Sequence, residues 1–253
     1  KLKARILIMN DKVLSPYIKS LALETPNLTP QDLQTVIRLI VRGVASEVQT
    51  AAFLTALRLR GLDTKGEFIA AAVTAILEFS SVVDRSLVAP EGYVDIVGTG
   101  GDGQNTFNVS TSAAIVAAGA GLKVCKHGGK ALTLTSGSGD FLKSLGVDVM
   151  KVNAESAPKV VSQPDFCFLF APAFHAGMGK VAPIRAQLAL PTIFNTLGPL
   201  INPIPLRARV LGVYSEALGE EYAKASLELN RGSDVHKRTV VVWGEVGLDE
   251  VSP

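Results

Sequence analysis

The chain has 253 residues, of which 47% are hydrophobic and 19% charged, and its formal net charge at pH 7 is +2. This composition excludes a disordered chain, and because the basic residues are scattered, we expect no nucleic-acid partner. No apolar stretch approaches the roughly 20 residues of a membrane-spanning helix, so we expect no membrane partner. Cys125 and Cys167 stand in apolar runs without a CxxC spacing. They are typical of buried free thiols in a reducing compartment and predict a cytoplasmic protein.

Residues 1–86 predict a helical domain. The stretch LTPQDLQTVIRLIVRG opens with Thr29 as N-cap and Pro30 in the first turn, and its apolar residues recur at helical spacing up to Gly43. The next stretch, SEVQTAAFLTALRLRG, repeats this pattern with Ser46 as its cap. TKGEFIAAAVTAILEFS predicts a third helix, so short turns would join a small bundle.

Residues 87–253 predict an α/β domain with a mainly parallel central sheet. Short apolar runs alternate with helical patterns here, which is typical of a parallel sheet covered by helices on both faces. Ligands of such sheets bind beyond the carboxyl ends of the strands. The expected strands are residues 93–97, 122–125, 166–170, 208–214 and 238–244, and the expected helices are about 110–120, 140–145, 154–162, 180–189 and 216–230.

A glycine-rich loop follows the first expected strand, in DIVGTGGDGQNTFNVSTSAA. Gly98, Gly100 and Gly103 satisfy the G-x-G-x-x-G pattern of a dinucleotide fold. That interpretation lacks the acidic residue expected about 20 positions later, where the chain reads LKVCKHGG, and Asp102 would repel a bare pyrophosphate. A Walker loop fails as well, because the Gly-Lys of HGGKAL is followed by Ala131.

The loop is better explained as a cradle for a sugar phosphate. Glycines let the backbone N–H groups of GTGGDG approach an anion closely. Asn108, Ser110 and Thr111 add side-chain donors at the start of the next helix, where the helix dipole favours negative charge. A divalent cation would screen Asp102. The alternative, that Ser110 or Thr111 only caps a helix, requires no long loop before it.

A second loop, CKHGGKALTLTSGSGD, has the same character. It has Lys126, His127 and Lys130 beside paired glycines, and then Ser136 and Ser138 before a helix. Loops after neighbouring strands of a parallel sheet lie at one edge, so both loops would meet the same anionic ligand. Taken alone, the serines are also typical of a flexible turn and the lysines of a solvated face.

Five separated motifs occur in order: DIVGTGGDGQNTFNVSTSAA, KHGGK with SGSGD, FAPAFH with IR, TIFNTLGPLINP, and GLDE. In sequence and spacing they resemble the anthranilate phosphoribosyltransferase family, and the HGGK form is most similar to fungal members. The resemblance covers the whole chain. It implies a small N-terminal helical domain, completed by helices from about 180–200, and a large α/β domain of the nucleoside phosphorylase type.

The resemblance also implies an activity, a pentosyl transfer of tryptophan biosynthesis. The amine of anthranilate is joined to C1 of phosphoribosyl pyrophosphate (PRPP), and pyrophosphate is released with Mg²⁺ as cofactor. Similar enzymes form homodimers through their helical domains. Family members continue well beyond the equivalent of Pro253, so the resemblance predicts an α/β domain truncated at its C-terminal end.

Site residues follow from the same resemblance. Lys126, Asp102 and Arg185 are expected to act in catalysis. The anthranilate site would contain Gly98, His127, Gly128, His175 and Arg185, and the metal site Ser110, Asp249 and Glu250. The PRPP site would contain Gly98, Thr99, Gly100, Gly101, Asp102, Thr106, Asn108, Ser110, Thr111, Lys126, Ser136 and Ser138.

Two departures from the family pattern concern affinity. Gly129 stands where members commonly have Asn, which removes a side-chain contact to substrate. Leu134 stands where they have a hydroxyl residue, which removes a donor toward phosphate. We therefore expect weaker binding more than lost activity.

The chemistry of the transfer agrees with these residue types. Displacement at a ribosyl C1 passes through an oxocarbenium-like state while negative charge grows on the departing pyrophosphate, so a positive field from Mg²⁺, Lys126 and loop N–H groups would stabilise it. The arylamine is neutral at pH 7, and Arg185 is suited to hold the anthranilate carboxylate. Two alternatives remain open: a pyrimidine nucleoside phosphorylase of the same architecture, and an inactive fragment of the transferase.

Overall fold

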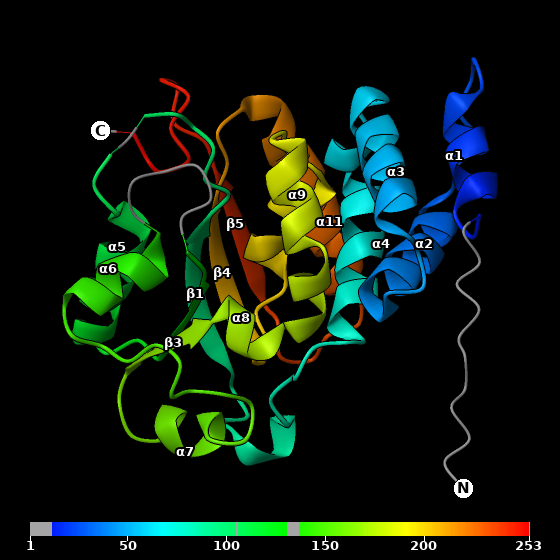
Figure 1. Cartoon of the computed structure of the whole chain (residues 1–253). Helices are drawn as coiled ribbons and strands as arrows, with labels where there is room; N and C mark the ends of the chain where they lie inside the picture. The colour runs from blue at the N-terminus through cyan, green and yellow to red at the C-terminus, as the bar shows by residue number, and fades with distance from the viewer. Residues whose placement is uncertain (1–11, 105, 131–136, 253) are drawn as a thin grey trace, which may run out of the picture.

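The computed structural model describes residues 12–104, 106–130 and 137–252. Helices α1 to α4 form one side of the molecule, the sheet with α5 to α7 forms the other, and α9 and α11 lie between them (Figure 1). Within the described ranges, none of the helices combines the length and the apolarity that crossing a membrane requires.

The helical part contains α1 (Ser15–Ala22), α2 (Pro30–Arg42), α3 (Glu47–Leu59), the short 3₁₀ turn η1 (Leu62–Thr64) and α4 (Gly66–Leu77). The predicted start of α2 is confirmed, because Thr29 and Asp32 each accept a hydrogen bond from the backbone N–H of the other, at 3.1 and 3.0 Å. Gly43 ends α2 in the left-handed conformation, with φ of 73°. Ser46 caps α3 as expected.

The sheet has five described strands in the order β3-β2-β1-β4-β5, and all neighbours are parallel, as the alternation of strands and helices predicts. The strands are β1 (Tyr93–Gly98), β2 (Val124–Gly128), β3 (Phe166–Phe170), β4 (Leu206–Gly212) and β5 (Arg238–Val242). Strand β2 begins and ends later than expected. Its last residues, including His127, belong to the strand because they pair with β3.

Helices connect these strands and cover the sheet. They are α5 (Val109–Gly119), α6 (Ser138–Ser144), α7 (Ala157–Val161), α8 (Ala171–Phe174), α9 (Ala182–Leu188), α10 (Ile193–Leu197) and α11 (Glu216–Leu229), with 3₁₀ turns η2 (Arg85–Leu87), η3 (Ala176–Lys180) and η4 (Gly198–Leu200). The helical spacing did not predict α8 or α10, which are too short to show a repeat. Helix α9 packs on α3, and α10 packs on α3 and α4.

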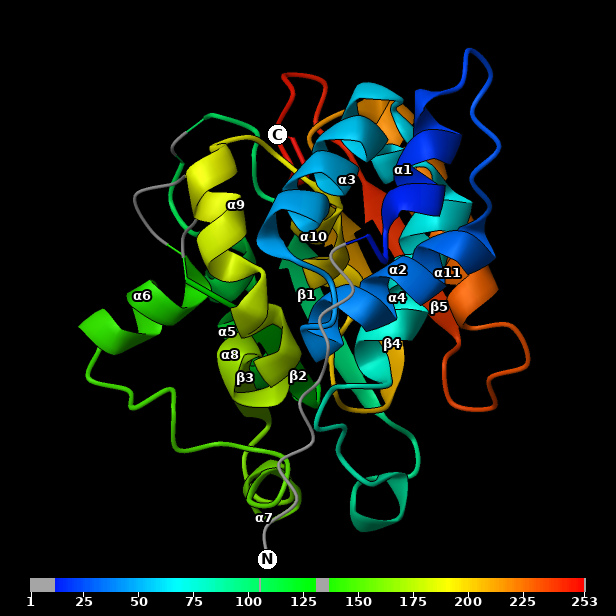
Figure 2. The ribbon, with the colours of Figure 1, turned by 45° about the vertical axis from the view of Figure 1, so that its right-hand side comes forward.

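One apolar core joins the two sides of the molecule. It contains Ile37 of α2 and Ile69 of α4 together with Leu211 of β4 and Tyr222 of α11. Helices α4 and α11 approach so closely that a Cβ on Gly66 would lie 2.5 Å from the backbone oxygen of α11 residue 221. Figure 2 shows α2, α4 and α11 side by side at this junction.

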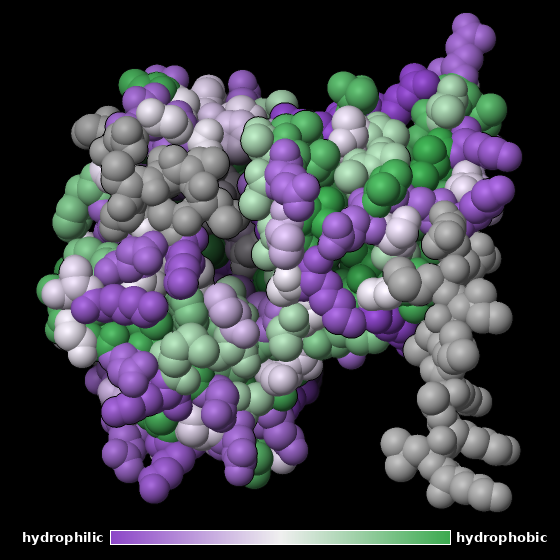
Figure 3. Space-filling view, in the orientation of Figure 1, coloured by the Kyte–Doolittle hydropathy of each residue, from purple (hydrophilic) through white to green (hydrophobic). Residues whose placement is uncertain are grey.

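The surface of α3 is unusually apolar for a solvent-exposed helix. Val48 and Leu59 are 80% and 81% exposed. Hydrophobic residues gather over this side of the molecule in the space-filling view (Figure 3). Such clusters mark interaction surfaces more often than single exposed residues do.

Candidate active site

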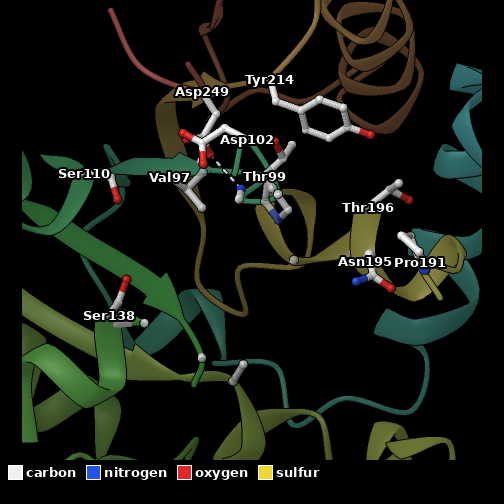
Figure 4. Close-up of a pocket in the computed structure, with 18 of the residues that line it drawn as sticks. Val97, Thr99, Asp102, Ser110, Ser138, Pro191, Asn195, Thr196, Tyr214 and Asp249 are labelled. Carbon is white, nitrogen blue, oxygen red and sulfur yellow. Dashed lines mark hydrogen bonds between the residues drawn. The ribbon is translucent and has the colours of Figure 1, made fainter. Parts of the chain in front are cut away.

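A cavity of about 400 Å³ lies at the carboxyl end of the sheet. The ends of β1 and β2 and the loops beyond the strands form one wall, and helices α3, α9 and α10 form much of the other. Figure 4 shows side chains from both walls turned toward one space, with Ser110 and Asp102 on the loop side and Asn195 and Thr196 on the helix side. The two glycine-rich loops therefore open on the same cavity.

The first loop follows a path that glycine makes possible. Gly100, Gly101 and Gly103 have φ of 64°, 82° and 69°, in the region that other residues rarely adopt. The N–H of Gly100 donates to a carboxylate oxygen of Asp249 at 2.6 Å. Gly98, Thr99, Gly100, Gly101, Asp102 and Thr106 all line the cavity.

The start of α5 brings the next polar group to the cavity. Asn108 caps the helix by accepting from the N–H of Thr111 at 3.1 Å. Asn108 and Ser110 line the cavity, whereas the side chain of Thr111 is fully buried behind the helix start. Its hydroxyl oxygen has no hydrogen-bond partner among the described residues. The structure thus brings two of these three predicted ligands to the site.

Lys126 is not among the residues that line the cavity. Its side chain is 1% exposed, and its ammonium donates to the carbonyl oxygen of Ile96 at 2.6 Å and to Oγ of Ser110 at 3.3 Å. Burial lowers the pKa of Lys126, and the negative charge of Asp95 opposes this shift. The ammonium therefore lies beneath Ser110 and meets the site from behind that hydroxyl.

The second loop contributes fewer residues than the sequence predicts. Gly129 and Ser138 line the cavity, but Gly128 does not. A Cβ on Gly128 would lie 3.0 Å from Cβ of Ser138, so this glycine lets the end of β2 pack against α6. Ser136 and Leu134, which we also predicted to affect phosphate binding, lie outside the described residues.

His127 and His175, both expected in the anthranilate site, contact each other directly. Their Nε2 atoms lie 3.1 Å apart, and both side chains are buried. Nδ1 of His127 lies 3.2 Å from the carbonyl oxygen of Gly198, and Nδ1 of His175 lies 2.7 Å from Oγ of Ser80. His127 lines the cavity, while His175 lies behind it. Both rings are therefore held by protein groups.

Arg185 lines the helix-side wall and is half-buried. Its Nη2 donates to Oδ1 of Asn195 at 3.0 Å, and its guanidinium lies 5.9 Å from the centroid of the Phe194 ring. These contacts fix the direction of the guanidinium. Sequence reasoning did not single out Asn195, although it lies within the quoted motif TIFNTLGPLINP.

Tyr214 is a second lining residue that sequence reasoning missed. It follows β4, and Figure 4 shows its ring extending across the cavity toward Thr196. Gly101 lies beneath the ring, since a Cβ there would be 3.8 Å from the ring carbons. Nothing in the one-dimensional pattern marks this tyrosine, because only the order of strands brings β4 beside β1.

The acidic pair lies at the base of the glycine-rich loop. Burial raises the pKa of Asp249, and the neighbouring Asp102 raises it further. Burial and the charge of Asp249 raise the pKa of Glu250 to about 7. Glu250 also accepts a hydrogen bond from the backbone N–H of Ser110, at the amino end of α5. A nearby cation would stabilise the charged form of carboxylates that lie this close together.

These residues fit a magnesium ion. Mg²⁺ prefers oxygen ligands and is commonly bound by one or two carboxylates together with substrate phosphates and water. Asp249, Glu250 and the hydroxyl of Ser110 are oxygen donors on one side of the cavity. In the described part of the chain, no three His, Cys, Asp or Glu side chains form a metal site by themselves. Such a site would therefore depend on substrate oxygens.

Comparison with known proteins identifies the family. The model described as "Glycosyl transferase family, a/b domain" matches residues 91–253, and "Glycosyl transferase family, helical bundle domain" matches residues 15–80. Anthranilate phosphoribosyltransferase of Saccharomyces cerevisiae is 48% identical over 97% of the chain, and that of Schizosaccharomyces pombe is 48% identical over 90%. The chain belongs to the anthranilate phosphoribosyltransferase family.

Solved structures of anthranilate phosphoribosyltransferases share this fold. The S. cerevisiae protein in complex with PRPP and Mg is 47% identical, with a TM-score of 0.88 over 96% of this chain. The Thermus thermophilus protein is 39% identical, with a TM-score of 0.78 over 92%. The chain spans 69% and 63% of the length of the two yeast relatives.

Proposed function

We propose that this chain is an anthranilate phosphoribosyltransferase that joins the amine of anthranilate to C1 of PRPP and releases pyrophosphate. The observation that carries the proposal is the shared cavity. One wall has glycine N–H groups, a helix start and an acidic pair, and the facing wall has Arg185. The S. cerevisiae relative is described in complex with PRPP and Mg, and also with 4-fluoroanthranilate.

In this proposal, the loop wall holds PRPP. The N–H groups of Thr99 and Gly100 already donate to Gly212 and Asp249. The N–H groups of Gly101 and Asp102 and the side chains of Asn108 and Ser110 would therefore bind its phosphates, as donors preorganised for negative charge. Mg²⁺ held by Ser110, Asp249 and Glu250 would supply positive charge to the departing pyrophosphate. Thr106 and Ser138 line the cavity and are proposed as further PRPP ligands, whereas Thr111 and Ser136 are proposed from the resemblance alone.

The facing wall holds anthranilate. A guanidinium pairs well with a carboxylate through two parallel hydrogen bonds, so Arg185 would fix the ring with its amine toward C1. Gly98 and His127 line the cavity on the opposite wall and would exclude water. Gly128 and His175 lie behind these residues, so we propose that they support the site without touching anthranilate.

The helical domain, residues 1–86 with α9 and α10, is proposed to pair two chains. Val48 and Leu59 on α3 supply exposed apolar surface for a homodimer. Residues 87–253 then form the PRPP-binding domain. The two free buried thiols and the biosynthetic role are those expected of a cytoplasmic enzyme.

The deciding experiment mixes the chain with PRPP, anthranilate and Mg²⁺ and measures pyrophosphate. Release that requires all three supports the proposal. Phosphate-dependent cleavage of uridine or thymidine without anthranilate-dependent release would identify a pyrimidine nucleoside phosphorylase. Neither activity, together with poor thermal cooperativity, would identify an inactive fragment.

A further inference from the structure

Strands β1 and β2 are neighbours in the sheet but share few paired residues among those the structure describes. Strand β1 pairs with β4 from Tyr93 to Gly98, and β2 pairs with β3 from Val124 to Gly128. Between β1 and β2, the only paired residues are Val94 and Val124 among those the structure describes. The two strands that lead into the phosphate loops therefore share little backbone pairing.

Side chains replace the missing backbone bonds at this gap. The N–H of His127 donates to a carboxylate oxygen of Asp95 at 3.3 Å. The amide of Asn202 donates to the other carboxylate oxygen of Asp95 at 2.8 Å and to the carbonyl oxygen of Cys125 at 2.9 Å. The ammonium of Lys126 donates a hydrogen bond to the carbonyl oxygen of Ile96 at 2.6 Å. We call Asp95, Lys126 and Asn202 the β1–β2 wedge.

Burial and nearby positive charge stabilise the Asp95 carboxylate within this wedge. The side chain of Asp95 is 0% exposed, and it lies opposite Arg209 in the register of β1 and β4. Both Lys126 and Arg209 attract the Asp95 carboxylate electrostatically. Burying a carboxylate is unfavourable unless hydrogen bonds and opposite charges offset its loss of hydration. Asp95 has hydrogen-bond donors and two nearby positive charges.

The gap has a direct consequence for the cavity. Val97 and Gly98 follow Ile96 into the first loop, and Gly129 follows β2 into the second, and all three line the cavity. A continuous ladder would hold neighbouring strands about 4.8 Å apart up to their ends. Here the side chains of the wedge bridge the two strands next to the loops instead, so they decide how the two loop ends lie relative to each other.

We propose that Asp95 and Asn202 are positioning residues for PRPP, acting through the β1–β2 wedge to set the separation of the two phosphate loops and the direction of the Lys126 ammonium. This inference rests on the proposed transferase function. Lys126 has three N–H donors. Ile96 and Ser110 use two of them among the described residues, so the ammonium is held directly behind the Ser110 hydroxyl.

The test is a reciprocal exchange of the two wedge partners. Asp95→Asn leaves one acceptor oxygen for the two N–H groups that Asp95 accepts, and Asn202→Asp turns a carboxylate toward Asp95, so each single variant loses a hydrogen bond of the wedge. The double variant Asp95→Asn/Asn202→Asp again places a donor opposite an acceptor between the two side chains, but it does not restore the bond to the carbonyl oxygen of Cys125. We expect each single variant to raise the KM for PRPP at least tenfold, and at least five times more than the KM for anthranilate. The double variant should recover part of this loss, because it regains the bond between the two side chains but not the bond to Cys125.

Ser226→Ala is the matched control. It removes a buried hydroxyl whose Oγ donates to Thr239 at 2.7 Å, between α11 and β5 and away from the cavity. It should lower the thermal midpoint without separating the two KM values. The proposal is overturned if the double variant recovers nothing, or if both KM values rise together in proportion to lost stability.

The same experiment separates this inference from the proposed function. Titration of the wild-type chain with PRPP and Mg²⁺ by calorimetry, with the pyrophosphate assay beside it, tests the function first. Absence of both signals in the wild-type chain refutes the transferase. An active wild-type chain with single variants of unchanged PRPP affinity refutes only the positioning role of Asp95 and Asn202.

Discussion

Nε2 of His127 and Nε2 of His175 lie 3.1 Å apart in a buried, edge-to-face arrangement with ring centroids 5.0 Å apart. Only one of these nitrogens can carry the shared proton. Because Nδ1 of His127 faces a carbonyl oxygen, it carries a proton, and Nε2 of the neutral ring accepts. His175 then donates from Nε2, and the single proton of the Ser80 hydroxyl is shared between Nδ1 of His175 at 2.7 Å and the carbonyl oxygen of Ile76 at 2.8 Å.

This pair predicts a loss of stability in mild acid. Burial lowers the pKa of His175 to about 4, from an ordinary value of 6.5, and burial and His175 lower that of His127 in the same direction. Below pH 6.5 the unfolded chain binds protons at these histidines that the folded chain does not bind. The free energy of unfolding therefore decreases as the pH is lowered. His175 alone should contribute a loss of about 2 kcal/mol between pH 7 and pH 5.

Urea unfolding at both pH values measures this effect. His175→Gln should unfold more easily at pH 7 but lose less stability on going to pH 5 than the wild-type chain. Val36→Ala provides the control, because this buried residue of α2 carries no titratable group and should be destabilised equally at both pH values. An unchanged pH dependence in His175→Gln would contradict the neutral buried pair.

Arg185→Ala should raise the KM for anthranilate about tenfold or more, while the affinity for PRPP changes little, since a lost charge-assisted bidentate pair costs about 1.5–3 kcal/mol. Arg185→Lys should be intermediate, because an ammonium keeps the charge but lacks the planar fork. Steady-state kinetics gives the first quantity, and calorimetry with PRPP and Mg²⁺ gives the second. An equal loss of both would remove the assigned role.

Gly212→Ala should weaken PRPP binding through the acidic pair. Gly212 pairs with Gly98, and a Cβ on Gly212 would collide with the backbone oxygen of Asp249. The segment carrying Asp249 and Glu250 must then move, so Mg²⁺-dependent PRPP affinity should fall while circular dichroism keeps its shape. Gly119→Ala is the control, since nothing lies within 4 Å of a Cβ there. Retained affinity in Gly212→Ala would exclude this coupling.

Gly129→Asn should strengthen substrate binding. The nearest atom to a Cβ on Gly129 is Cβ of Ala171, at 4.0 Å, so the side chain enters open space in the cavity. An amide there adds a donor and an acceptor without displacing a neighbour. We expect a lower KM for anthranilate or PRPP with an unchanged thermal midpoint. A lower thermal midpoint would show that the cavity has no room for the amide.

The sequence by itself determined most of the longer elements and the family. Caps such as Thr29 and Ser46 act within a few residues, and alternating apolar runs reflect burial on both faces of a parallel sheet, so both signals are local. The glycines of the first loop also predicted its path from the sequence, because their backbone conformation excludes most other side chains.

Tertiary structure alone decided which polar residues meet. The replacement of the β1–β2 ladder by Asp95 and Asn202, the contact of His127 with His175, and the burial of Lys126 beneath Ser110 join positions between 16 and 107 residues apart. No short-range pattern encodes such distances. They follow from strand order and packing, because a buried polar group must find its partner wherever the fold brings one within reach.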